Sequence, residues 1–139
     1  MFIVIDTNVI VSALLTPLGN ASKILDMVIS GDLTLLYDDR IITEYREVLI
    51  REKFGFVEKD VDILLGHIEA EGRRIASTVY NENLPDIDDI PFLEVAFGGN
   101  ADALVTGNKK HFKVKKAAGL KILSPDEFLT LLKHRSKEK

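Results

Sequence analysis

The sequence contains no cysteine among its 139 residues, which excludes disulfides and thiolate metal sites. This absence agrees with a reducing, cytoplasmic location and leaves oxygen and histidine as the ligands for any metal ion. The three histidines do not have the spacing of zinc ligands: they are His67, His111 and His134. We expect them to be structural or to lie on the surface.

Long hydrophobic runs are also missing. The apolar segment over residues 1–15 follows no basic stretch and is interrupted by Asp6, whereas a membrane span needs about 20 apolar residues. We therefore expect a soluble protein without signal peptide or membrane span. Its hydrophobic content of 46% can fill one core, and no repeat or linker divides the chain. We expect a single domain over residues 1–132 and a basic tail over residues 133–139.

The chain has no overall excess of positive charge. Its net charge of −4 argues against a polyanionic binding partner, because phosphate binding depends on Lys and Arg. The charges are, however, unevenly distributed along the chain. Residues 109–139 contain ten Lys or Arg against three Asp or Glu, whereas residues 1–108 contain eight against nineteen. The last six residues are equally well explained as a solvated tail. The denser run over residues 109–116 is a candidate surface for binding phosphate.

The apolar pattern predicts strands that alternate with helices. Short β-branched runs indicate strands over residues 2–5, 33–37, 103–106 and 120–123. Helical spacing indicates helices over residues 8–15, 21–29, 39–53 and 60–71 and a short one ending at Phe97. Ser124, Pro125 and Glu127 form the start of a last helix. The alternation predicts an α/β fold, a three-layer α/β/α sandwich with a mainly parallel central sheet of four or five strands.

Two polar segments follow predicted strands of this sheet. Asp6 comes directly after the first strand, and Thr106 and Asn108 end the third. Because ligands bind outside the carboxyl ends of parallel strands, we expect these segments to lie side by side. An Asp in this position is often a helix N-cap. The functional interpretation is a metal ligand, with Thr7 and Asn8 as hydrogen-bonding neighbours, and the two roles need not exclude each other.

A second acid, Glu44, borders the apolar stripe of its predicted helix, close to Ile41 and Val48. A carboxylate beside the core needs a partner. That partner is either an Arg or Lys side chain, or a metal shared with Asp6, and the sequence leaves both open.

A third group of acids precedes the short helix that ends at Phe97: Asp86, Asp88 and Asp89. One acid would suffice to complement the helix dipole. Three within four residues repel one another unless a cation or a proton relieves the charge, and Asp89 lies on the apolar stripe with Phe92. Mg²⁺ and Mn²⁺ prefer such oxygen ligands and can activate water against a phosphodiester.

Taken in order, four segments resemble a PIN domain: the strand ending in Asp6-Thr7-Asn8, the helix with Glu44, the Asp-rich turn ending at Asp89, and residues 99–108, GNADALVTGN. The resemblance covers residues 1–132 and extends to the PIN-domain proteins grouped with the VapC-type toxins of toxin–antitoxin pairs. It implies a Mg²⁺- or Mn²⁺-dependent endoribonuclease that hydrolyses phosphodiester bonds of single-stranded RNA.

The resemblance also implies roles for single residues. Asp6, Glu44 and Asp89 match the family's metal-binding acids, and Thr106 matches the residue that helps to hold the metal-bound water. Thr7, Asn8 and Asp88 would hydrogen-bond these ligands. The family further implies a cognate antitoxin protein as partner and a homodimer.

One position departs from the family's pattern. Many relatives carry a fourth acid two residues after the threonine, where this chain has Asn108, whose amide can ligate Mg²⁺ but brings no charge. Asp102 precedes the strand, at the opposite edge of the sheet, and does not replace it. The lysines that follow Asn108 would hold the RNA backbone: Lys109, Lys110 and Lys113.

Three alternatives compete with the nuclease. A catalytically weak or silent PIN domain that binds RNA or protein is favoured by Asn108. A phospho-receiver domain would need an acidic pair after its first strand, where this chain has only Asp6. A haloacid-dehalogenase-like phosphatase would need a second Asp at the position of Asn8.

Overall fold

A computed structural model describes residues 1–76, 87–112 and 119–137. Within these residues five strands form one parallel sheet in the order β3-β2-β1-β4-β5. The strands are β1 (Phe2–Ile5), β2 (Thr34–Tyr37), β3 (Arg73–Arg74), β4 (Ala103–Val105) and β5 (Lys121–Leu123). The predicted parallel sheet is confirmed.

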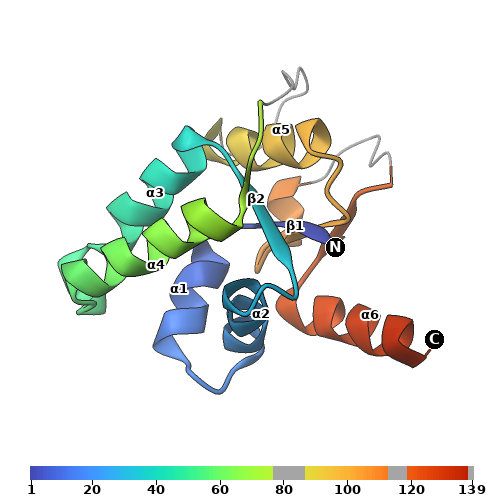
Figure 1. The fold of residues 1–139 in the computed structure, drawn as a ribbon, viewed down its shortest axis with the longest axis horizontal. Helices are drawn as coiled ribbons and strands as arrows, with labels where there is room; N and C mark the ends of the chain where they lie inside the picture. The colour runs from blue at the N-terminus through green and yellow to red at the C-terminus, as the bar shows by residue number, and fades with distance from the viewer. Residues whose placement is uncertain (77–86, 113–118, 138–139) are drawn as a thin grey trace.

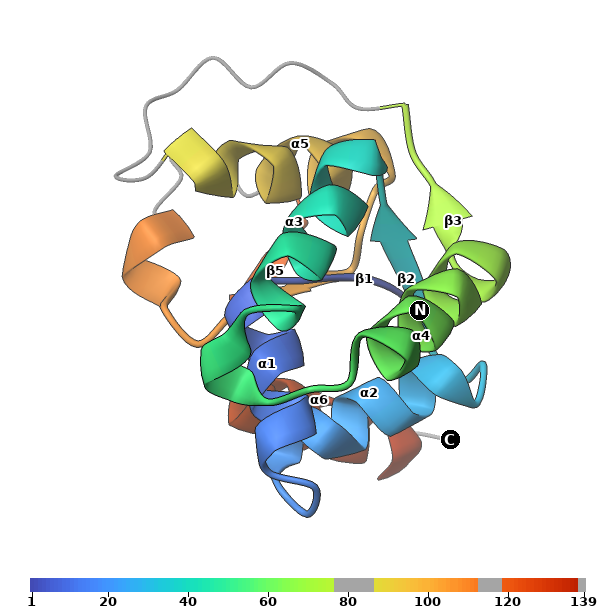
Figure 2. The ribbon, with the colours of Figure 1, turned by 90° about the vertical axis from the view of Figure 1, so that its left-hand side faces the viewer.

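Six α-helices surround this sheet in the described part of the chain: α1 (Thr7–Leu15), α2 (Asn20–Ile29), α3 (Asp39–Leu49), α4 (Glu58–Glu71), α5 (Ile90–Gly98) and α6 (Pro125–Lys137). Figure 1 shows α5 above the sheet and α1, α2 and α6 below it. Figure 2 shows α3 and α4 in front of the sheet in the turned view. Short 3₁₀ turns are η1 (Glu52–Phe54), η2 (Ile87–Asp89) and η3 (Lys109–Phe112). The three-layer α/β/α sandwich is therefore confirmed.

The central strands are apolar throughout because helices cover both faces of the sheet. Ile3, Val4, Leu104 and Val105 expose essentially none of their surface, and β1 lies between β2 and β4. Helix α5 contacts β1, β2 and β4, whereas α6 contacts β4, β5 and α2. The apolar runs that predicted these strands are the middle layer of the core.

Two elements differ from the expectation. The third helix ends at Leu49, and residues 52–54 form the separate turn η1 instead of continuing it. Strand β3 was not predicted, because it consists of two exposed arginines and has no apolar alternation.

The last helix begins as the sequence predicts. The backbone amide of Glu127 donates to Ser124 Oγ at 3.1 Å, and the amide of Ser124 donates to Glu127 Oε1 at 2.9 Å, which is a reciprocal capping box. Helix α6 continues to Lys137. The domain boundary at residue 132 remains a prediction. None of the helices in the described ranges is long and apolar enough to cross a membrane.

The chain order places a topological switch point at one edge of the sheet. From β1 the chain builds outward through β2 to β3 and then returns to β4 on the other side of β1. The connections that leave β1 and β4 therefore run in opposite directions. Ligands bind at such a switch point, outside the carboxyl ends of the two strands.

Candidate active site at the carboxyl ends of β1 and β4

Asp6 occupies the N-cap position of α1, but its side chain makes no capping hydrogen bond. Oδ2 of Asp6 instead accepts a hydrogen bond from Thr106 Oγ1 at 2.9 Å, across 100 residues of sequence. The side chain is buried, with 8% of the residue exposed. The expected side-chain cap is therefore not formed. The carboxylate faces the end of the neighbouring strand.

Thr106, the residue that follows β4, holds that carboxylate. Its residue exposure is 0%, and its hydroxyl donates to Asp6 while accepting the backbone amide of Asn108 at 3.0 Å. Because the amide can only donate, the hydroxyl proton is directed to Asp6. The topology-based expectation that these two strand ends meet is confirmed by this contact. Asn108 itself is exposed.

Glu44 reaches the same region from α3. Its carboxylate accepts a hydrogen bond from the hydroxyl of Thr7, the residue after Asp6. This contact gives the carboxylate beside the core a polar partner, and that partner is a threonine on α1. Because Thr7 follows Asp6 directly, this contact brings Glu44 to the segment of chain that carries Asp6. Asn8, the third residue of this segment, is exposed.

Tyr45 follows Glu44 on α3, and the sequence did not single it out as a site residue. The residue is completely buried, and its hydroxyl donates to the carbonyl oxygen of Ile5 at 2.5 Å. Burial raises the pKa of the phenol well above its usual range, and the negative charges of Asp6 and Glu44 raise it further. The phenol therefore stays protonated and remains a hydrogen-bond donor at the end of β1.

Asp89 occupies the N-cap position of α5 and, like Asp6, makes no side-chain capping hydrogen bond. It is buried, with 8% of the residue exposed. The start of α5 packs against α3 through Phe92 and Tyr45, whose ring centroids are 6.3 Å apart. The neighbouring Asp88 is exposed, and it lines a groove of about 560 Å³ together with Glu44 and residues of α3 and η2.

A metal site has to be tested against these positions. Across residues 1–76, 87–112 and 119–137, no group of three or more His, Cys, Asp or Glu is arranged to hold a metal ion. The donors at the strand ends are carboxylate and hydroxyl oxygens, of the type that Mg²⁺ and Mn²⁺ prefer. Mg²⁺ is often bound through one or two carboxylates and several waters. The donor chemistry therefore fits such an ion, and the three-acid centre remains a prediction.

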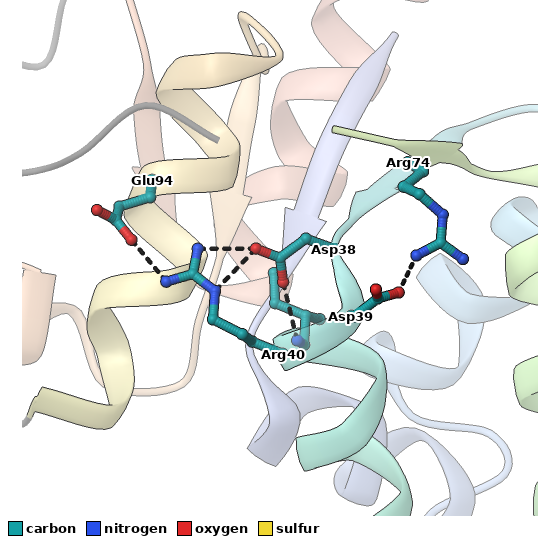
Figure 3. A network of polar contacts seen from close by, with 6 residues as sticks. Asp38, Asp39, Arg40, Arg74 and Glu94 are labelled. Atoms are coloured by element: carbon teal, nitrogen blue, oxygen red, sulfur yellow. Dashed lines mark hydrogen bonds and ion pairs between the residues drawn. The ribbon is translucent and has the colours of Figure 1, made fainter. Parts of the chain in front are cut away.

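An ion-pair network missed by the sequence argument joins α3 to α5 beside the site. Figure 3 shows Arg40 between Asp38 and Glu94, with its Nη1 2.7 Å from Glu94 Oε1 and its Nη2 2.7 Å from Asp38 Oδ2. Asp38 also caps α3 by accepting the amide of Ile41 at 3.1 Å. Glu94 is the single charged residue of an otherwise apolar α5, and that was the available sequence signal. The network ties the helix that begins after Asp89 to the end of β2.

The lysines expected to bind RNA begin in η3, which follows β4. Lys109 and Lys110 are exposed, and Nζ of Lys109 lies 3.0 Å from Glu127 Oε1 of α6. The backbone amide of Ser124 lowers the pKa of Glu127 most, and the ammonium of Lys109 lowers it further. Lys113 lies outside the described residues. The described part of the lysine cluster thus follows the Thr106 turn and is tied to α6.

Comparison with known proteins assigns the family. The sequence profile described as PIN domain matches residues 2–110. The fold is similar to a chain in the crystal structure of VapBC2 from Rickettsia felis bound to a DNA fragment from their promoter. The TM-score is 0.59 and the identity 18%, over 88% of this chain and 97% of that one. No curated protein matches. The chain belongs to the PIN-domain family.

Proposed function

We propose that this protein is a metal-dependent endoribonuclease that hydrolyses phosphodiester bonds of single-stranded RNA, and that it is the toxin of a toxin–antitoxin pair. One observation carries the proposal: a buried aspartate directly after β1 is held by a buried threonine directly after β4, and it does not cap its helix. A buried carboxylate held at the switch point of a parallel sheet lies where folds of this kind bind their ligands.

The acids proposed to hold Mg²⁺ or Mn²⁺ are Asp6, Glu44 and Asp89. The amide oxygen of Asn108 would add a neutral ligand. When bound, the cation would lower the pKa of the attacking water and stabilise the negative charge that develops at the phosphodiester.

The chain's own residues would orient this centre. Thr106 donates to one oxygen of Asp6, which leaves the orientation of the other oxygen fixed. Thr7 has the same effect on Glu44. Asp88 and Asn8 are exposed, and we propose that they hydrogen-bond these ligands. Residues that orient ligands in this way commonly change metal affinity or activity by about 10–100-fold when they are removed.

RNA as the substrate is supported by the family match and by the charge of the chain's end. Lys109 and Lys110 are exposed where the strand end meets solvent, and Lys113 continues the same run of sequence. The VapBC2 complex supports an antitoxin as protein partner. A homodimer and a cytoplasmic location complete the proposal.

The alternative is a PIN domain that binds RNA or protein without cleaving. Two observations favour it: Asn108 replaces a charged ligand, and in the described residues the acids do not form a ready three-acid cluster. Binding would then use the same edge of the sheet, without hydrolysis.

Cleavage of a fluorescent single-stranded RNA in Mn²⁺ by the wild type and by Asp6→Asn distinguishes the two. The substitution keeps the side chain's shape and an oxygen that can accept from Thr106, but it removes the charge. We expect cleavage to fall by at least about 100-fold, since the charge is what retains the cation. Equal cleavage by both proteins would reveal a contaminating nuclease and would leave the binding module as the function.

A further inference from the structure

We propose that Tyr45 is a positioning residue that sets the relative placement of the three acid-bearing elements β1, α3 and α5. The inference rests on the proposed nuclease function and adds a residue to it. The buried side chain of Tyr45, on α3, contacts β1 close to Asp6 and α5 close to Asp89.

The first contact is the hydrogen bond from the Tyr45 hydroxyl to the carbonyl of Ile5, at the end of β1. The amide of Asp6 donates to the carbonyl of Val105 on β4 at 2.9 Å. Because the C=O and N–H of a trans peptide point in opposite directions, the carbonyl of Ile5 points away from β4, to the side of β2. Pairing between β1 and β2 has already ended there: its register runs only through Ile3 and Leu35, whereas pairing with β4 continues to Ile5.

The Tyr45 hydroxyl therefore supplies the donor that β2 does not. A buried carbonyl without a partner is unfavourable, so this hydrogen bond fixes the peptide that immediately precedes Asp6. Since the amide side of that peptide is held by β4, the phenol and the strand together determine the direction in which the Asp6 side chain leaves the sheet.

The second contact extends the effect to α5. The ring of Tyr45 packs at a tilt of 39° against Phe92, which lies three residues after Asp89. Tyr45 is the residue after Glu44 on α3. Its hydroxyl contacts the peptide before Asp6, and its ring contacts a residue one helical turn after Asp89. Helix α3 cannot shift relative to β1 or α5 without disturbing this ring.

The chain offers a matched control in Tyr37. It is also buried, at 3% exposure, and its hydroxyl also donates to a backbone carbonyl, that of Glu69 on α4, at 2.7 Å. Tyr37→Phe and Tyr45→Phe remove the same hydroxyl from the same kind of contact. Only the second contact adjoins Asp6.

The experiment compares both full-length variants with the wild type in three measurements: melting temperature, Mn²⁺ binding followed by the electron paramagnetic resonance of free Mn²⁺, and RNA cleavage. We expect the two variants to lose similar amounts of melting temperature. Tyr45→Phe should weaken Mn²⁺ binding and lower kcat, each by about tenfold, with little change in the KM for RNA. Tyr37→Phe should stay within about twofold of the wild type, because it leaves the acids in place.

Cleavage is measured well below each melting temperature and normalised to folded protein, so that a loss of stability does not imitate a loss of positioning. Mn²⁺ affinity and kcat that match between the two variants would overturn the inference and make Tyr45 an ordinary core residue. That outcome is separate from failure of the nuclease proposal, in which the wild type itself would cleave no better than Asp6→Asn.

Discussion

Asp6 and Asp38 occupy the same place in two neighbouring strand–helix connections, yet their side chains do different things. Each follows the last residue of a parallel strand and precedes a helix. Asp38 caps α3 through the amide of Ile41 and pairs with Arg40. Asp6 makes no cap and is bound by Thr106. The same local sequence position thus produces a structural acid after β2 and a candidate catalytic acid after β1.

The adjoining strand explains the difference. Beside β1 lies the end of β4, which offers a buried hydroxyl where the topology reverses. The carboxylate of Asp38 has a cation from its own helix instead. What decides the role of an acid at a strand end is therefore the partner brought to it by the sheet order, which local sequence rules do not contain.

The strongest test of this comparison is Thr106→Val, which removes the hydroxyl at nearly constant volume. Asp6 loses its donor and the amide of Asn108 loses its acceptor, inside a site with no exposed Thr106 surface. We expect cleavage to fall by about 10–100-fold and the free energy of unfolding to fall by about 1–3 kcal/mol. RNA cleavage assays and urea denaturation measure the two effects. Unchanged cleavage by a folded variant would show that Asp6 needs no orientation from β4.

Asp38→Ala is the matching change after β2. Loss of the cap should lower the free energy of unfolding by about 1–2 kcal/mol, while cleavage per folded molecule stays within about twofold because Asp38 is structural. Asp38→Asn separates the contributions, since its amide oxygen can still cap α3 but no longer carries the charge that pairs with Arg40. A large loss of cleavage in Asp38→Asn, with stability retained, would erase the distinction between the two strand ends.

Charge reversal of Lys109 and Lys110 tests whether the end of β4 also carries the RNA contacts. Each phosphate contact of single-stranded RNA contributes about 0.7 to the slope of log affinity against log salt, so the double variant should flatten the slope by up to about 1.4. Filter binding at several salt concentrations measures it. The control is Lys23→Glu with Lys59→Glu, on α2 and α4, where both lysines are exposed. Equal slopes in the two double variants would assign the effect to net charge alone.

Glu127→Gln gives the smallest expected effect and concerns an acid that follows β5. Its pKa is lowered by the amide of Ser124 and then by Lys109, so its ionised form is favoured in the folded state. Such a group stabilises the fold above its ordinary pKa of 4.5, and this contribution is lost as the pH falls through the lower, folded value. Melting temperatures should therefore differ between wild type and variant at pH 7 and converge below pH 4.5. A difference that persists at pH 2 would contradict this origin.

Much of the fold is contained in local patterns. The apolar runs of β1, β2 and β4 and the capping box of α6 were recognisable because each is a contiguous signal. Strand β3 was not, because two exposed arginines join the sheet only through pairing with β2. The meeting of Asp6 and Thr106 was predictable from strand order, since the carboxyl ends of parallel strands share an edge.

The contacts that support the site were harder to predict from the sequence. The role of Tyr45 depends on where pairing between β1 and β2 ends, and no residue pattern in α3 reveals it. The Thr7 partner of Glu44 depends on the packing of α1 against α3. Glu94 could have been noticed as a lone charge in an apolar helix, but its pairing with Arg40 joins helices far apart in sequence.

The central claim is that Asp6, Glu44 and Asp89 share one metal ion. Diffraction from a crystal soaked in Mn²⁺, recorded on both sides of the manganese absorption edge, tests it directly. The account predicts one anomalous peak bordered by these three carboxylates and close to the Thr106 turn. A peak elsewhere on the protein, or none at a Mn²⁺ concentration that supports RNA cleavage, would contradict it.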